Sequence, residues 1–305
     1  MMNRRQLSVA DNVSQADLGQ ALALRLGFDP QALTEFQQRR IFGYYLPVAF
    51  WIYAQAQLRQ SCLMVGINGP QGSGKSTLTA QLVFLLEKLG LRAVTVSVDD
   101  FYLTHMEQNA LAAAHPGNPY LEYRGYPGTH DVALGKHTLK ALKESEAGVG
   151  IQIPVYDKSQ HGGRGDRAPL SAWRKVTGPF DVLLIEGWML GFTPQFHGSL
   201  TDPHLTIVDS KLGAYRAWHD LMDAWLVLKI SDPTWVYRWR AEAEANMKVA
   251  GKPGLSEAEI KDYIDRFMPA YQSYLPGLYA RELLAGRQMT LEMGEDRLPL
   301  YGPTV

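Results

Sequence analysis

The chain contains almost no cysteine, no long hydrophobic run and almost no net charge. Cys62 is the single cysteine in 305 residues, which excludes an internal disulfide and favours a reducing compartment, with Cys62 as a small buried hydrophobe. The most apolar tract, 41–54, is too short to span a bilayer and is interrupted by Gly43 and Pro47. A formal net charge of −1 argues against nucleic acid or an anionic membrane as the main partner, because proteins that bind them usually carry a basic excess.

The sequence also lacks internal repeats, low-complexity linkers and the apolar run that would make its first residues a secretory signal. Residues 1–15 carry two arginines without such a run, so a cytoplasmic location is expected. The hydrophobic content of 46% and the charged content of 20% are those of a globular chain with a large core. We therefore expect one large domain with additions.

A complete phosphate-binding motif is present at residues 69–77, Gly-Pro-Gln-Gly-Ser-Gly-Lys-Ser-Thr. It fits G-x-x-x-x-G-K-[ST], and it has the strand before it (63–67) and the helix after it (78–89) that the motif requires. Its glycines allow a concave backbone whose N–H groups bind phosphate. Lys75 would bridge the outer phosphates of ATP, and the Ser76 hydroxyl would hold Mg²⁺. The alternative, a glycine-rich turn with a chance Lys-Ser pair, does not account for both flanks. The ATP-binding residues predicted in this loop are Gly69, Gln71, Gly72, Ser73, Gly74, Lys75, Ser76 and Thr77.

Apolar, β-branched runs alternate with helical patterns along the chain. The alternation predicts an α/β fold of the P-loop NTPase type with three layers, a mostly parallel sheet with helices on both faces. Residues 1–60 are expected to form a helical amino-terminal extension that packs on the body or binds a partner, with helix starts at Ser14 and at Asp29-Pro30. The expected strands lie near 63–67, 93–98, 182–185, 225–230 and 288–292. The main expected helices lie near 78–89, 131–146, 234–249 and 256–267.

Acidic residues follow two of the predicted strands. Asp99 and Asp100 come after 93–98, and Glu186 comes after 182–185. Ligands in parallel sheets bind beyond the carboxyl ends of the strands, so these acids should converge on the phosphate loop. Glu186 is placed to orient Mg²⁺, and Asp99 or Asp100 to accept the proton of a hydroxyl that attacks the γ-phosphoryl group. This arrangement indicates a kinase, whereas an isolated acid would be explained by a helix cap or a surface turn.

Six segments of the chain are similar to those of one known family. Residues 124–131 and 156–167 are the most discriminating parts. The family that the chain resembles is that of the D-glycerate 3-kinases of plants, cyanobacteria and fungi, within the phosphoribulokinase, uridine kinase and pantothenate kinase group of P-loop kinases. The segments that carry the resemblance are 66–77, 97–102, 124–131, 154–159, 163–167 and 186–192.

This resemblance implies roles for individual residues. Asp99 matches the catalytic base of the group and Glu186 its metal-associated acid. Arg238 and Arg240 stand on an arginine-bearing lid, at about 233–254, that folds over the phosphates of ATP. The predicted catalytic residues are Asp99 and Lys75, and the predicted metal-binding residues are Ser76, Glu186 and Asp99.

An acceptor such as D-glycerate presents a carboxylate and two hydroxyls, so its site needs a fixed cation and several hydrogen-bonding groups. Arg124, Arg164 and Arg167 are candidates for the carboxylate, and a polar stretch that includes Lys158 could orient the hydroxyls. Alternatively, His130 packs beside a helix cap and the glycine-rich loop around Arg164 is a flexible surface loop. The predicted acceptor-binding residues, in an insert at about 103–170, are Asp100, Tyr102, Arg124, His130, Tyr156, Asp157, His161, Arg164 and Arg167.

The sequence thus favours an enzyme that transfers the γ-phosphoryl group of Mg-ATP to the 3-hydroxyl of D-glycerate, giving 3-phosphoglycerate and ADP. Only the resemblance indicates which hydroxyl reacts. Two alternatives stay open: a kinase for another small alcohol, such as a nucleoside or pantothenate, and a nucleotide-binding switch or ATPase that acts on a protein partner. Residues 61–305 would be the kinase domain, as a monomer or a homodimer.

Overall fold

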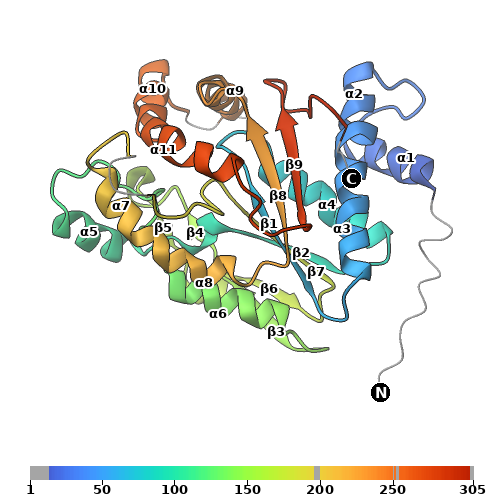
Figure 1. Cartoon of the computed structure of the whole chain (residues 1–305), viewed down its shortest axis with the longest axis horizontal. Helices are drawn as coiled ribbons and strands as arrows, with labels where there is room; N and C mark the ends of the chain where they lie inside the picture. The colour runs from blue at the N-terminus through green and yellow to red at the C-terminus, as the bar shows by residue number, and fades with distance from the viewer. Residues whose placement is uncertain (1–13, 196–199, 250, 252–253, 303–305) are drawn as a thin grey trace.

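The computed structural model describes residues 14–195, 200–249, 251 and 254–302. The strands of its central sheet are β1 (Leu63–Asn68), β2 (Ala93–Ser97), β7 (Val182–Gly187), β8 (Ala224–Ile230) and β9 (Gln288–Met293). All of them are parallel, in the order β2-β7-β1-β8-β9 (Figure 1). Two small antiparallel sheets accompany it, β3 (Gly150–Ile153) with β6 (Arg174–Thr177) and β4 (Tyr156–Asp157) with β5 (Asp166–Arg167).

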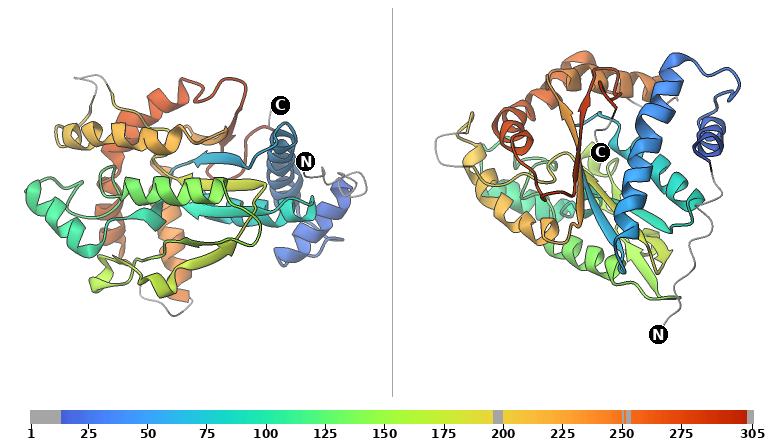
Figure 2. Two further views of the ribbon diagram at one scale, coloured as in Figure 1. Left: turned by 90° about the horizontal axis from the view of Figure 1, so that it is seen from below. Right: turned by 45° about the vertical axis from the view of Figure 1, so that its right-hand side comes forward.

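Helices cover both faces of the sheet. They are α1 (Gln15–Arg25), α2 (Glu35–Arg40), α3 (Leu46–Gln57), α4 (Lys75–Lys88), α5 (His105–Ala114), α6 (Val132–Lys143), α7 (Leu205–Leu212), α8 (Arg216–His219), α9 (Trp235–Val249), α10 (Glu257–Asp265) and α11 (Met268–Tyr279). Figures 1 and 2 show α3 and α4 on one face and α6, α8 and α11 on the other. The predicted three-layer α/β fold is therefore confirmed. Within the described ranges, no helix is long and apolar enough to cross a membrane.

The burial of β1 and β7 explains why the sequence predicts these two strands clearly. Every residue of β1 and of β7 is buried, as in parallel strands that are covered on both faces. Their register pairs Ile67 with Glu186, and β2 pairs Ser97 with the same Glu186. The end of β2, the end of β7 and the loop after β1 consequently meet at one edge of the sheet.

The described part of the amino-terminal segment shares its core with the sheet. Leu22, Ile41 and Ile52 are fully buried in the same hydrophobic cluster as β1 and β7, while residues 1–13 lie outside the described residues. The expected helix start at Asp29-Pro30 is wrong, because the Asp29 carboxylate accepts the Gln31 N–H in a turn at 2.9 Å. The next helix, α2, begins only at Glu35.

Candidate active site

The phosphate loop has the backbone shape that its glycines predict. Gly72 and Gly74 have positive φ angles of 76° and 89°, where residues with a side chain are strained. A Cβ at Gly72 would also lie 2.7 Å from the Cβ of Trp239 in α9. The Gln71 N–H donates to the Tyr271 hydroxyl of α11 at 3.1 Å. The loop is thus held between α9 and α11, and Lys75 opens α4 directly after Gly74.

Lys75, Ser76 and Glu186 lie together at the carboxyl edge of the sheet. The Ser76 hydroxyl donates to a Glu186 carboxylate oxygen at 2.7 Å, and the Lys75 ammonium donates to the Pro70 carbonyl at 3.0 Å. Burial lowers the pKa of Lys75, while the charges of Glu186 and Asp99 act in the opposite direction. The three strand ends are therefore close enough to act on one another electrostatically.

Asp99 offers an ionised carboxylate beside this group. It accepts a hydrogen bond from the Tyr102 hydroxyl at 2.8 Å and pairs with the Lys158 ammonium at 2.5 Å. Burial alone would raise the pKa of Asp99, but Lys158 and Tyr102 outweigh it, so this pKa lies below its usual value. Since 30% of the side chain is exposed, the carboxylate can accept a proton from a bound hydroxyl.

Asp100 has a different role in the structure. Its carboxylate accepts the Ser97 N–H at 3.0 Å and closes a capping box for the 3₁₀ turn η3 (Val98–Phe101). Burial raises the pKa of Asp100 to about 6. Of the two neighbouring acids, Asp99 is the one whose carboxylate meets side chains of the site.

The raised pKa of Asp100 predicts a dependence of stability on pH. The native state binds this proton more tightly than the unfolded chain, so the wild type loses stability as the pH rises from about 4 through about 6. Asp100→Asn keeps the hydrogen-bond acceptor and does not titrate. We expect its free energy of unfolding, relative to wild type, to rise by about 2 to 3 kcal/mol between pH 4 and 7 in urea titrations. Asp157→Asn, at a carboxyl whose pKa is lowered to about 2 by hydrogen bonds, is the control and should show no such rise; an equal rise there would contradict the assignment.

Two predicted acceptor residues surround Tyr102 and keep a polar atom without a partner. The His130 ring stacks on the Tyr102 ring with centroids 4.5 Å apart, and the Tyr156 ring meets Tyr102 edge-on at 5.2 Å. Burial lowers the pKa of His130 to about 4, so the ring is neutral. Within the part of the chain that the structure describes, His130 Nε2 and the Tyr156 hydroxyl are buried without hydrogen-bond partners. Each atom therefore has a hydrogen bond left to form.

The predicted cations of the acceptor site differ in what they contact. Arg167 donates to the Tyr102 carbonyl at 3.0 Å and to the Asp131 carboxylate at 3.3 Å, next to the ring cluster. Arg124 donates to the backbone carbonyls of Gly163 and Arg164, so it fastens the loop after β4. Arg164 itself lies 3.9 Å from a Glu122 oxygen and is 43% exposed.

Two other predicted acceptor residues hold their own loop together. The Asp157 carboxylate accepts hydrogen bonds from Ser159 and Gln160. The His161 ring lies 3.2 Å from an Asp166 oxygen and stacks on the His105 ring at 3.8 Å. These contacts shape the loop that carries Lys158 to Asp99.

The lid arginines pair with acids and not with the phosphate loop. Arg238 contacts Glu242 at 3.1 Å and Glu295 at 3.0 Å, and Arg240 pairs with Glu244. A residue that sequence reasoning missed, Arg297, donates from Nε to the Gly72 carbonyl at 2.7 Å. Arg297 follows β9, 225 positions from the loop, and no motif surrounds it. Residues 250 and 252–253 of the expected lid lie outside the described residues.

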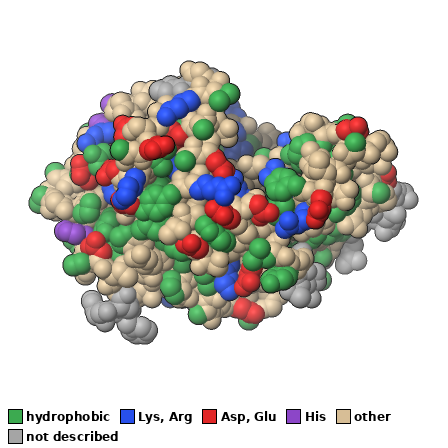
Figure 3. Space-filling view, turned by 90° about the horizontal axis from the view of Figure 1, so that it is seen from above, with side chains coloured by type: hydrophobic (Ala, Val, Ile, Leu, Met, Phe, Trp, Pro, Cys, Tyr) green, Lys and Arg blue, Asp and Glu red, His purple; other side chains and the backbone are tan. Residues whose placement is uncertain are grey.

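A pocket of about 410 Å³ lies over the phosphate loop, within the range of small-molecule sites. Figure 3 shows the hollow from above, between the lobe of amino-terminal helices on the right and the body on the left. The pocket is lined by Arg40, Tyr44, Tyr45, Gly72, Ser73, Gly74, Lys75, Ser76, Thr77, Trp239, Glu242, Ala243, Asn246 and Arg297.

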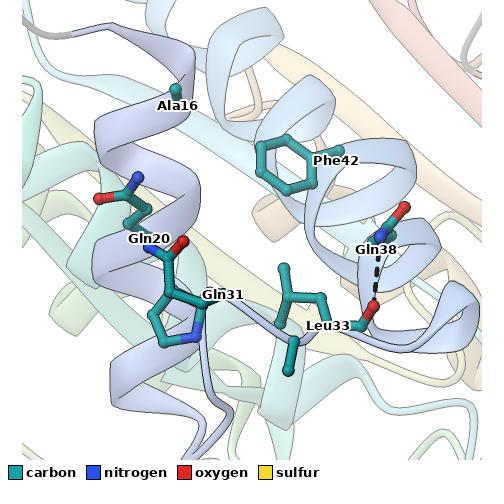
Figure 4. Close-up of a pocket in the computed structure, with 8 residues that line it drawn as sticks. Ala16, Gln20, Gln31, Leu33, Gln38 and Phe42 are labelled. Atoms are coloured by element: carbon teal, nitrogen blue, oxygen red, sulfur yellow. Dashed lines mark hydrogen bonds between the residues drawn. The ribbon is translucent and has the colours of Figure 1, made fainter.

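A second pocket, of about 320 Å³, lies between α1 and the turn into α2 (Figure 4). Phe42, Leu33 and three glutamines line it, and the Gln38 amide donates to the Leu33 carbonyl at 3.1 Å. None of the lining residues carries a charge. This second pocket therefore offers no charged side chain for binding a phosphate or a metal ion.

Comparisons with known proteins agree with this geometry. Residues 64–202 match the phosphoribulokinase / uridine kinase family. The chain is 43% identical over 284 residues to the chloroplastic D-glycerate 3-kinase of Arabidopsis thaliana. That match covers 88% of this chain but only 62% of the Arabidopsis protein. It is 37% identical over 250 residues to an uncharacterised kinase of Schizosaccharomyces pombe. That match covers 78% of this chain and 90% of that kinase.

A solved structure extends the likeness to the fold. The D-glycerate 3-kinase of Cryptococcus neoformans has a TM-score of 0.78 and 31% identity, and the match covers 85% of this chain and 98% of that one. Because the Schizosaccharomyces and Cryptococcus proteins are matched over 90% and 98% of their own length, the likeness is not confined to the phosphate loop. The chain belongs to the phosphoribulokinase/uridine kinase family of P-loop kinases, in the group that includes the D-glycerate 3-kinases.

Proposed function

We propose that this kinase transfers the γ-phosphoryl group of ATP to the 3-hydroxyl of D-glycerate, giving 3-phosphoglycerate and ADP. The observation that carries the proposal is the ionised Asp99 carboxylate beside Lys75 and Glu186 at the carboxyl edge of the sheet. The substrate comes from the relatives named D-glycerate 3-kinase, at 43% and 31% identity. The position of the reacting hydroxyl rests on the family alone.

In this reaction the acceptor hydroxyl oxygen attacks the γ-phosphorus, the bond from that phosphorus to the β-phosphate oxygen breaks, and Asp99 takes the hydroxyl proton. Lys75 and the loop amides stabilise the negative charge of the transferring group. Tyr102 and Lys158 hold Asp99 in place through its two carboxylate oxygens. The low pKa of Asp99 keeps it ionised and ready to act at neutral pH.

The residues at the loop fit a magnesium ion that arrives with ATP. Ser76 and Glu186 place a hydroxyl and a carboxylate oxygen 2.7 Å apart, and Mg²⁺ prefers such hard oxygen ligands with few from the protein. Among the described residues, no group of three or more His, Cys, Asp or Glu side chains could hold a metal ion, which agrees with a shared site. Bound Mg²⁺ would neutralise charge on the phosphates.

The acceptor would lie on the far side of Asp99 from the loop, in the insert at about 103–170. Tyr156 and His130 offer unpartnered polar atoms for its hydroxyls, and Arg167, which donates to the Tyr102 carbonyl at 3.0 Å, is our candidate for its carboxylate. Closure of the lid, about 233–254, would release Arg238 or Arg240 from its acidic partner toward the phosphates. A cytoplasmic location and the choice between monomer and homodimer stay predictions.

The test is ADP production from Mg-ATP with D-glycerate, L-glycerate, uridine, pantothenate or no acceptor, with the phosphorylated product identified. We expect turnover that depends on D-glycerate and yields 3-phosphoglycerate. Turnover with uridine or pantothenate in place of glycerate would assign a different alcohol to the same site. Nucleotide binding without any acceptor-dependent turnover would instead support a switch or ATPase that acts on a protein.

A further inference from the structure

The pocket over the phosphate loop has a wall that comes from the amino-terminal segment. Arg40, Tyr44 and Tyr45 line it together with the loop residues 72–77. The amino-terminal segment therefore reaches the site and does more than cover the sheet.

A local irregularity of the helix lies where the three side chains line the pocket. Arg40 directly precedes a π-helix, η2 (Ile41–Tyr45), whose Ile41 carbonyl accepts the Leu46 N–H five residues on. The wider turn of a π-helix changes which residues share a face, and such turns recur at functional sites. In a continuous α-helix, adjacent residues such as Tyr44 and Tyr45 would point about 100° apart.

Arg40 is a cation without an acid. Its guanidinium lies over the Phe36 ring at 4.8 Å, and its Nε is buried without a hydrogen-bond partner within the described residues. No carboxylate in the described chain forms an ion pair with it, whereas its neighbour Arg39 lies 3.6 Å from an Asp296 oxygen. A partly buried charge without a partner is costly, so its position in the pocket wall indicates an anionic ligand.

The composition of the pocket indicates which part of the ligand lies there. Asp99 and Glu186, which mark the end of the loop where transfer occurs, do not line this pocket. Beyond the phosphate-loop residues 72–77, the pocket is lined by aromatic side chains, including Trp239 and Tyr45, which suit a purine base and ribose. A cation at that end would meet the phosphate that is attached to the nucleoside.

We propose that Arg40 binds the phosphate nearest the nucleoside in ATP and ADP, so that the amino-terminal segment is part of the nucleotide site. The inference rests on the nucleotide binding in the proposed function. It adds a cation from outside the phosphate loop. It also places the π-helix η2 at the nucleotide site, since Tyr44 and Tyr45 of this helix line the same pocket as Arg40.

The test compares Arg40→Met, which keeps the packing on Phe36 and removes the charge, with wild type. Calorimetry with ADP, and displacement of ADP by AMP and by adenosine, gives the three dissociation constants. We expect the Kd of ADP and of AMP to rise by about 10- to 100-fold, as for a lost charge-assisted hydrogen bond, and that of adenosine to change by less than about twofold. The matched control is Arg25→Met, which removes another arginine of the segment, one that bonds Gln81 of α4 at 2.9 Å.

The outcomes separate the two proposals. A wild type that fails to bind ADP overturns the proposed function, whereas wild-type affinity in Arg40→Met overturns only this inference. An equal loss for adenosine, or an equal loss of ADP affinity in Arg25→Met, also overturns it, since the effect would then be structural. If Arg40→Met does not fold, Arg40→Lys and Arg40→Gln decide: the inference requires tighter ADP binding by the lysine variant, and equal affinities contradict it.

Discussion

Replacing Asp99 by asparagine should lower kcat by about 10³-fold, within the range known for loss of a general base, while the Kd of ADP changes by less than about threefold. Asparagine keeps an oxygen that accepts the Tyr102 hydroxyl hydrogen bond, so the local shape survives. It cannot take the proton of the acceptor hydroxyl, and it leaves Lys158 without its carboxylate. Steady-state kinetics with saturating D-glycerate, together with ADP calorimetry, measures both quantities.

Asp100→Asn is the matched control, because Asp100 is the adjacent acid and its carboxylate caps η3. We expect that variant to keep kcat within about tenfold of wild type, since asparagine keeps an oxygen that can accept the Ser97 N–H. The opposite pattern, with Asp100→Asn inactive and Asp99→Asn active, would move the base to Asp100. Loss of activity in both variants would show that activity needs the η3 turn as a whole. It would contradict a separate role for Asp99 as the base.

The sheet, and the residues at the carboxyl ends of its strands, could be predicted from the sequence because each depends on a short stretch of neighbouring residues. The apolar runs of β1 and β7 mark strands that are covered on both faces, and a motif of nine residues specifies the loop between β1 and α4. Once the strands are parallel, the carboxyl ends must share an edge. That rule alone brings Asp99 and Glu186 to Lys75, with no knowledge of distances.

The partner of Asp99 could not be predicted in this way. Lys158 is 59 residues from Asp99 and reaches it on the loop after β4, a strand of two residues in a two-stranded sheet. The sequence shows a polar stretch there, but a lysine that faces solvent and a lysine that pairs with a base have the same local pattern. Tertiary contacts of this kind leave no periodicity to detect.

Helix α11 and Arg297 were missed for related reasons. Pro276 lies inside α11, and proline normally argues against a helix interior. Arg297 meets the Gly72 carbonyl across most of the chain, while the lid arginines Arg238 and Arg240, expected from the resemblance, bond acids instead. Which arginine touches a phosphate loop depends on how the surface elements pack, and charge patterns in the sequence do not specify that.

Replacing Lys75 by methionine should weaken ATP binding by about 10- to 100-fold and lower kcat by about 10²- to 10³-fold. The ammonium contacts phosphate in the ground state and stabilises more charge in the transition state, so both constants should change. Lys75 is 8% exposed, and burial lowers its pKa, which means that burial disfavours the charge of its ammonium. Methionine of similar length removes that cost, so the variant should melt at or above the wild-type temperature without nucleotide.

The combination of unchanged stability and lost function distinguishes a role in phosphate binding from a role in the core. Lys88→Met is the control, because Lys88 ends the same helix α4 with its ammonium over the Phe84 ring, a full helix length from the loop. It should leave the Kd of ATP and kcat within about twofold, as expected for a surface change. A Lys75→Met enzyme whose kcat/KM for ATP stays within about tenfold of wild type would contradict the phosphate-loop assignment. Asp99 would then lack the neighbour that neutralises the transferring group, and the whole proposed reaction would have to be rebuilt around another cation.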